Sequence, residues 1–90
     1  MPYLQATIKG RVQGVGFRDF VRRSAQKLGL DGQVRNLANG DVEVEAVGDR
    51  ETLQALMKKL REGPGFAYVT DIDEEWMDHG PKFRGFQIAF

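Results

Sequence analysis

The residues that most constrain how this chain folds are 8–18, where an alternating segment gives way to glycines and then to an amphipathic segment. A strand, a glycine turn and the start of a helix together form an anion-binding site, because free N–H groups and the positive end of the helix point outward. Gly14 and Gly16 let the backbone come close to a ligand. Arg18 falls in the first helical turn, where its guanidinium can bind two phosphate oxygens at once.

The spacing of the glycines limits what such a turn binds. Gly10, Gly14 and Gly16 match neither the dinucleotide fingerprint nor the Walker loop, since the intervals differ and no Lys-Ser or Lys-Thr pair follows. Glycine turns between a strand and a helix are common, and most of them bind no ligand. From spacing alone, a phosphate site and a purely structural turn are both open.

The length and composition of the chain predict one domain that spans residues 1–90. With 41% hydrophobic residues, 90 residues form a single core but not a second one. No window approaches the roughly 18 uninterrupted apolar residues of a membrane helix, and the N-terminus lacks the basic-then-apolar pattern of a signal peptide. We therefore expect a cytoplasmic monomer that binds no membrane.

Several types of site are excluded by composition. The chain has no cysteine, so it has neither a disulfide nor a thiolate nucleophile, and its single histidine does not favour a zinc site. We expect no metal and no cofactor.

The charge of the chain is divided between its two parts. Residues 1–40 hold seven Lys and Arg against two acids, a net charge of +5, whereas residues 41–90 hold six against eleven, a net charge of −5. This split suits a small anionic ligand better than a nucleic acid, which needs a basic excess over a whole face.

Two periodic segments flank the glycine turn. Residues 3–12 alternate between apolar and polar side chains, which predicts a half-buried strand. Its apolar face consists of Leu4, Ala6, Ile8, Gly10 and Val12. From Phe17 to Leu28 the apolar residues recur at helical spacing, which predicts an amphipathic helix that ends at Gly29. The basic residues away from its apolar stripe predict a solvated face, formed by Arg22, Arg23 and Lys27.

Residues 31–48 predict a β-hairpin. Its arms flank Asn39-Gly40, the dipeptide typical of a two-residue turn in which both central residues have a positive φ. Asn36 is harder to interpret, because asparagine is unfavourable in a strand and this one lies short of the turn. A hydrogen bond that caps the loop and a role in a binding site are both open.

The rest of the chain predicts a second helix and two more strands. Asp49 is a suitable N-cap for a helix that ends at Gly63. Residues 67–76 and 83–90 predict the strands, and we expect His79 between them to be exposed. An acidic cluster on the first of these strands fits either a cation site or, as is usual on a strand, a solvated edge. It consists of Asp71, Asp73, Glu74, Glu75 and Asp78.

The predicted order is strand, helix, strand, strand, helix, strand and a short final strand. This split βαβ pattern predicts a ferredoxin-like α/β sandwich, an antiparallel sheet of four to five strands with both helices packed on one face. Right-handed crossovers place the first strand beside the second hairpin arm, in the middle of the sheet. The glycine loop and the first hairpin arm then come near one another, which makes Arg18 and Asn36 candidates for one site.

Two stretches of the sequence resemble the acylphosphatases, small enzymes that hydrolyse carboxyl-phosphate anhydrides. Residues 10–18 are similar to the family signature Gly-X-Val-Gln-Gly-Val-X-Phe-Arg without a break. Residues 32–48 are similar to the hairpin signature that contains the catalytic asparagine. One departure is Gln33, where the family usually carries an aromatic residue. That difference concerns the packing of the first hairpin arm rather than the chemistry.

The resemblance implies an enzyme that converts an acyl phosphate and water to a carboxylate and inorganic phosphate. It implies that Arg18 binds the substrate phosphate together with the loop amides, and that Asn36 positions the attacking water. The implied phosphate-binding loop consists of Gln13, Gly14, Val15, Gly16, Phe17 and Arg18. Inorganic phosphate is then both the product and a competitive inhibitor.

Two other functions compete with this interpretation. One is a phosphate-binding or carbamoyl-phosphate-binding module without turnover, as in the acylphosphatase-like domains of larger carbamoyl-transfer and hydrogenase-maturation proteins. Because the sequence ends at Phe90 without a cysteine-rich extension, we expect the free enzyme instead. The other is an RNA-binding ferredoxin-like domain. It would need exposed aromatic residues in the run Lys/Arg-Gly-Phe/Tyr-Gly/Ala-Phe, which the sequence lacks.

Overall fold

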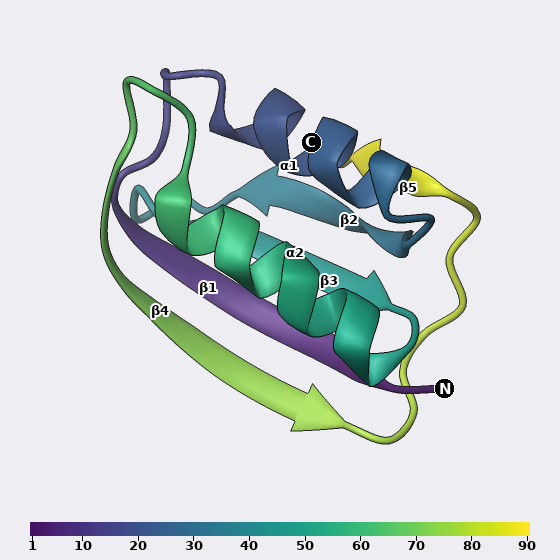
Figure 1. Ribbon diagram of the computed structural model, residues 1–90. Helices are drawn as coiled ribbons and strands as arrows, with labels where there is room; N and C mark the ends of the chain where they lie inside the picture. Colours follow the sequence, from purple (N-terminus) through teal and green to yellow (C-terminus); the bar gives the residue numbers. More distant parts are fainter.

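The computed structural model describes residues 1–90 as a five-stranded sheet with both helices packed on one face (Figure 1). The strands are β1 (Tyr3–Arg11), β2 (Asp31–Asn36), β3 (Val42–Val47), β4 (Tyr68–Met77) and β5 (Phe86–Ile88), and the helices are α1 (Phe17–Lys27) and α2 (Arg50–Glu62). The strand order is β4-β1-β3-β2-β5, so β1 lies beside β3 in the middle of the sheet. The predicted ferredoxin-like sandwich is confirmed.

The sheet is mixed rather than wholly antiparallel, because β5 runs parallel to β2. Met77 at the end of β4 pairs with Tyr3, which lies across β3 from Asp31 at the start of β2. The chain therefore leaves β4 at the end of the sheet where β2 begins. It crosses that end and joins the outer edge of β2, which leaves β5 only the parallel direction. The crossing takes up residues 78–85, so the final strand is shorter than the predicted 83–90.

One core of 17 buried residues lies between the sheet and the helices. The apolar faces predicted from periodicity supply it. The buried helical residues in it are Phe17, Val21 and Ala25 from α1 and Leu53, Leu56, Met57 and Leu60 from α2. Tyr3 lies on the other face of β1, yet only 6% of its surface is exposed, since Gly80 in the crossing segment packs against its ring.

The loop between β2 and β3 differs from the predicted two-residue turn. The Leu37 N–H donates to Asp41 O at 2.8 Å and the Gly40 N–H donates to Leu37 O at 3.2 Å, which closes a three-residue loop. Of the two residues Asn39 and Gly40, only Gly40 has a positive φ, of 98°. The Asn39 side chain instead accepts a hydrogen bond from the Asp41 N–H at 3.0 Å. Asparagine stabilises this turn through its side-chain oxygen, so the prediction of a positive φ at both positions was wrong.

Four residues of the acidic cluster lie on β4, which forms one edge of the sheet, and Asp78 directly follows this strand. Its members are exposed, and two of them pair with basic residues: Asp73 with Lys9 at 3.3 Å and Glu74 with Arg61 at 2.8 Å. No three of the acidic side chains gather as a group that could hold a metal. The solvated-edge interpretation is confirmed, and His79 is exposed as expected. Neither helix has the length and apolarity needed to span a membrane.

Candidate active site

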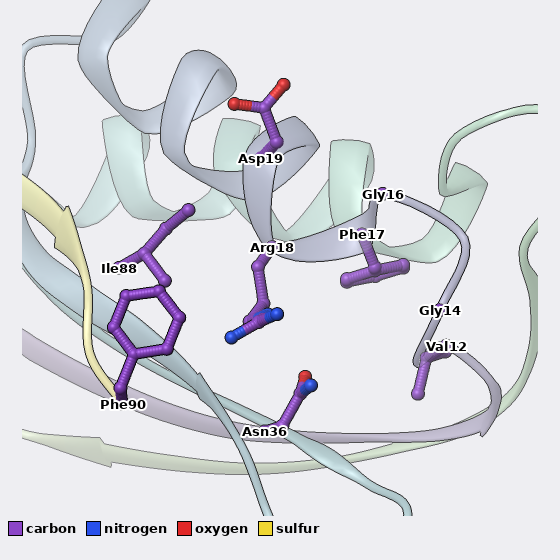
Figure 2. A pocket seen from close by; sticks show the side chains of 9 residues that line it. All are labelled: Val12, Gly14, Gly16, Phe17, Arg18, Asp19, Asn36, Ile88 and Phe90. Atoms are coloured by element: carbon purple, nitrogen blue, oxygen red, sulfur yellow. The ribbon is translucent and has the colours of Figure 1, made fainter.

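Three strands end on the same side of the sheet, beside the N-terminus of α1. Ile8 of β1 and Asn36 of β2 both pair with Val42 of β3, and Val34 of β2 pairs with Ile88 of β5. The three strands β1, β2 and β5 thus run in one direction and finish near one another. Because a short loop joins the end of β1 to α1, the first turn of this helix lies close to all three strand ends (Figure 2).

Apolar side chains fix the loop that joins β1 to α1. Val12 and Phe17 each expose only 1% of their surface, and Val15 between them packs against the core. Gly14 and Gly16 have φ angles of 73° and 77°, which glycine adopts without the strain that a side chain brings. The loop backbone is therefore held in place from within, while its two glycines remain exposed to a ligand.

Arg18 offers a guanidinium that is free of carboxylate partners. It belongs to none of the five ion pairs, and its guanidinium carbon lies 5.1 Å from the centre of the Phe90 ring. The carboxylate of the neighbouring Asp19 pairs with other arginines and not with Arg18: Arg23 Nε donates to it at 2.9 Å, and Arg22 also pairs with it. In Figure 2 the Asp19 side chain points away from Arg18. A free cation thus lies in the first turn of an 11-residue helix.

Asn36 points from the end of β2 toward Arg18 (Figure 2). Its side-chain oxygen Oδ1 is buried and receives no hydrogen bond from the protein. A buried acceptor without a donor costs about 1–3 kcal/mol, so this oxygen does not stabilise the fold. The loop after it is closed by Leu37, Asn39 and Asp41 instead. The loop-capping interpretation of Asn36 is therefore wrong.

Gln13 joins the glycine loop to the hairpin that carries Asn36. Its Nε2 donates to Leu37 O and to Asp41 O, both at 2.8 Å. A side-chain amide nitrogen carries two N–H groups, one for each carbonyl. Gln13 therefore holds the two halves of the site together, and its side chain binds the hairpin rather than the cavity.

These residues surround a cavity of about 180 Å³. It is lined by Val12, Gly14, Gly16, Phe17, Arg18, Asp19, Asn36, Ile88 and Phe90 (Figure 2). The structure thus brings Arg18 and Asn36 together with three residues of the predicted loop. Gln13 and Val15, the other two, do not line the cavity.

Four lining residues were not predicted from the sequence: Val12, Asp19, Ile88 and Phe90. Ile88 and Phe90 belong to residues 83–90, for which the sequence predicts only a strand. No local signal indicated that these two residues reach the site, because only the parallel pairing of β5 with β2 brings them there.

Gln33, which stands where the acylphosphatases usually carry an aromatic residue, forms a cross-strand hydrogen bond from Nε2 to Glu45 Oε1 at 3.0 Å. This bond lies on the face of the sheet away from the helices.

Known proteins share both the sequence and the fold. The acylphosphatase family model matches residues 4–88. An acylphosphatase of Salinibacter ruber is 45% identical over 85 residues, which cover 94% of this chain and 90% of the relative. The crystal structure of acylphosphatase from Bacillus subtilis has a TM-score of 0.97 at 37% identity, with 100% of both chains covered. A crystal structure of full-length HypF in its phosphate- and nucleotide-bound form matches 99% of this chain with 12% of its own, at a TM-score of 0.87 and 28% identity.

Proposed function

This chain belongs to the acylphosphatase family and hydrolyses acyl phosphates, and we propose that Arg18, Asn36 and the amides of the glycine loop carry out the reaction. The proposal rests on one observation above all. A free guanidinium and an amide oxygen without a protein donor face one another across one cavity. The first of these groups suits a phosphoryl anion, and the second suits the water that attacks it.

The phosphoryl group of the substrate binds between the glycine loop and Arg18. The first N–H groups of α1 have no partner within the helix, and the helix dipole adds positive potential at the same point. Phosphoryl transfer passes through a loose transition state whose charge is spread over the phosphoryl oxygens. The buried Val12 and Phe17 hold the loop, and the first turn of α1 carries Arg18. These donors therefore need little rearrangement as the P–O bond breaks.

The reaction needs no acid for the leaving group. A carboxylate leaves, and because the pKa of its conjugate acid is about 4, its oxygen does not have to be protonated at neutral pH. The only carboxylate that lines the cavity is Asp19, which is paired with Arg22 and Arg23. The same reasoning predicts slow hydrolysis of alkyl phosphate monoesters, whose alkoxide leaving group does require an acid.

Asn36 orients the attacking water. Water donates a hydrogen bond to the unpaired Oδ1, which places its oxygen beside the phosphoryl group. A neutral amide orients water without deprotonating it, and both hydrogens of the water end on the product phosphate, since RCO–OPO₃²⁻ and H₂O give RCO₂⁻ and H₂PO₄⁻. We therefore expect Asn36 to act on the turnover step more than on substrate affinity.

Alanine variants assayed with acetyl phosphate test these roles. Arg18→Ala should lose about 3 kcal/mol or more of transition-state stabilisation, at least about 100-fold in kcat/KM. Asn36→Ala should lower kcat more than it raises KM. Arg35→Ala is the matched control, since Arg35 adjoins Asn36 but pairs with Glu43 at 2.8 Å instead of lining the cavity. Near-normal hydrolysis by Arg18→Ala, or a change confined to KM in Asn36→Ala, would contradict the proposal.

We further propose that one domain spanning residues 1–90 acts as a cytoplasmic monomer on small acyl phosphates, without a metal, a cofactor or a nucleic acid. Inorganic phosphate should inhibit competitively, because the loop recognises the charge of the product. Activity should survive incubation with EDTA, and a loss that Mg²⁺ restores would refute the metal-free mechanism.

The higher identity to the Salinibacter ruber enzyme than to HypF, 45% against 28%, favours the free enzyme over a non-catalytic carbamoyl-phosphate-binding module.

A further inference from the structure

A second hollow lies between the two helices, apart from the phosphate cavity. Its volume is about 250 Å³, and residues of both α1 and α2 line it. It shares no lining residue with the phosphate cavity. The steps proposed for acyl phosphate hydrolysis therefore leave this hollow without a role.

Small side chains leave the space between the helices open. Phe20, Ser24 and Leu28 follow one another at four-residue intervals, so they lie along one face of α1 and its C-cap. The exposed Ala55 of α2 lines the same hollow. Ser24 and Ala55 are too short to fill the space, whereas the partly buried Phe20 and Leu28 pack against the core and form apolar walls.

Three cations surround these apolar walls: Arg23, Lys27 and Lys59. Lys27 and Lys59 belong to none of the five ion pairs. Arg23 pairs with Asp19 through Nε, at 2.9 Å. No carboxylate lines the hollow. The hollow therefore combines an apolar surface with two ammonium groups that have no anionic partner.

The charge of the whole molecule favours an anion at the same place. The two helices hold eight basic and three acidic residues, a net charge of +5, whereas the five strands hold three basic and seven acidic residues, a net charge of −4. Both helices lie on one face of the sheet (Figure 1). An anion is therefore attracted to the helical face of the molecule and repelled from the sheet.

The size of the hollow limits the ligand to a small molecule. Sites for drug-sized ligands have volumes of about 300–1,000 Å³, and this hollow, at about 250 Å³, lies just below that range. It is thus too small for a helix of a partner protein or for a nucleic-acid strand. An apolar body that carries one anionic group matches its walls and its charges.

We propose that the hollow between α1 and α2 binds a small amphipathic anion, of the class of medium-chain carboxylates. The apolar chain packs against Phe20, Leu28 and Ala55, and the carboxylate binds Lys27 and Lys59. The Phe20 ring centre lies 6.0 Å from that of Phe17, which lines the phosphate cavity. The bound anion therefore lies one side chain away from the phosphate cavity without entering it.

A titration with octanoate, followed by the NMR shifts of the backbone amides, tests the site. Saturating inorganic phosphate is present throughout, so that the phosphate cavity is already occupied. Octanoate should give saturable shifts that are largest in residues 20–28 and 55–59. Octylammonium, which has the same chain and the opposite charge, should bind at least about tenfold more weakly. Hexanoate should bind several-fold more weakly, because it buries two fewer methylene groups.

Two substitutions at neighbouring exposed positions of α2 give a matched pair. Ala55→Glu fills the hollow and adds a negative charge there, so the Kd of octanoate should rise about tenfold or more. Gln54→Glu makes the same charge change at a position that does not line the hollow, and its Kd should stay within about twofold. Glutamate is a good helix former, so both variants should fold, and the dispersion of the same spectra checks this.

The two lysines give a second matched pair. Lys59→Gln should raise the Kd about two- to fivefold, whereas Lys58→Gln, next to it but outside the hollow, should leave the Kd unchanged.

Four results would overturn the inference. The first is the absence of saturable shifts up to about 10 mM octanoate. The second is shifts confined to the phosphate loop and Asn36 that phosphate suppresses, which would place the carboxylate in the phosphate cavity. The third is equal binding of octylammonium, and the fourth is equal binding by Ala55→Glu and Gln54→Glu.

Discussion

Replacing Gln13 by alanine tests whether the phosphate loop and the asparagine hairpin must be held together. The Gln13 side chain is the direct connection between them, through hydrogen bonds from Nε2 to Leu37 O and Asp41 O at 2.8 Å each. Gln13→Ala removes both donors and leaves the backbone of the loop unchanged. We therefore expect a less stable protein in which Arg18 and Asn36 no longer keep their relative positions.

The structure sets the size of the stability loss. Each hydrogen bond contributes about 0.5–1.5 kcal/mol, so two give about 1–3 kcal/mol. Neither carbonyl is left without a donor, because Leu37 O still accepts from the Gly40 N–H and Asp41 O from the Leu37 N–H. The penalty for an unsatisfied buried acceptor is thus avoided. We expect the free energy of unfolding to fall by about 1–2 kcal/mol, in the lower part of that range.

Urea unfolding gives the stability, and acetyl phosphate hydrolysis gives kcat/KM. If the bridge keeps the two catalytic groups aligned in the transition state, a loss of about 1.4 kcal/mol there corresponds to a tenfold lower kcat/KM. Gln33→Ala is the matched control, because it also removes one amide donor, to Glu45 at 3.0 Å, on the face of the sheet away from the helices. This variant should keep full activity.

Two results would refute the reasoning. If Gln13→Ala unfolds more easily but keeps kcat/KM within about twofold, the bridge stabilises the fold without aligning the site. If Gln33→Ala loses as much activity as Gln13→Ala, the loss comes from a general effect on the hairpin rather than from the bridge.

Two further predictions concern stability. Gly16→Ala should cost about 1–2 kcal/mol from its positive φ alone, since the space beside Gly16 is open. Gly10→Ala should cost clearly more, because its Cβ would also collide with the backbone oxygen of Tyr68; equal urea midpoints would contradict this. Burial, aided by a hydrogen bond to Glu45, raises the pKa of Tyr3. The contribution of the neutral Tyr3 to the free energy of unfolding is therefore fully present below the unfolded tyrosine pKa of about 10, and it is lost as the pH rises above that value. Between pH 9 and 12 the stability of Tyr3→Phe should therefore fall less steeply than that of the wild type, and identical slopes would refute the role of Tyr3.

Local sequence was sufficient for most of the elements and for the main residues of the candidate site. The alternation in residues 3–12 and the helical spacing after Phe17 predicted β1 and α1 to within about one residue. They did so because each pattern reflects which side of a single element is buried. Arg18 and Asn36 were found from their places beside a glycine loop and a hairpin, and the structure brings them to one cavity. Their catalytic roles remain predictions.

Contacts between distant parts of the chain were decided only by the tertiary structure. The direction of β5 depends on where β4 leaves the sheet, so no local pattern indicated that Ile88 and Phe90 would line the site. Gln13 was predicted as part of the phosphate-binding loop, which remains a prediction, and no local pattern indicated that its side chain reaches a hairpin 24 residues away. Periodicity reports how one segment meets the core, whereas these contacts depend on how separate segments are placed against one another. The sequence by itself therefore determined the elements and about half of the residues that line the cavity. The pairing of β5 with β2 and the contact between Gln13 and the β2–β3 hairpin determined the rest of the site.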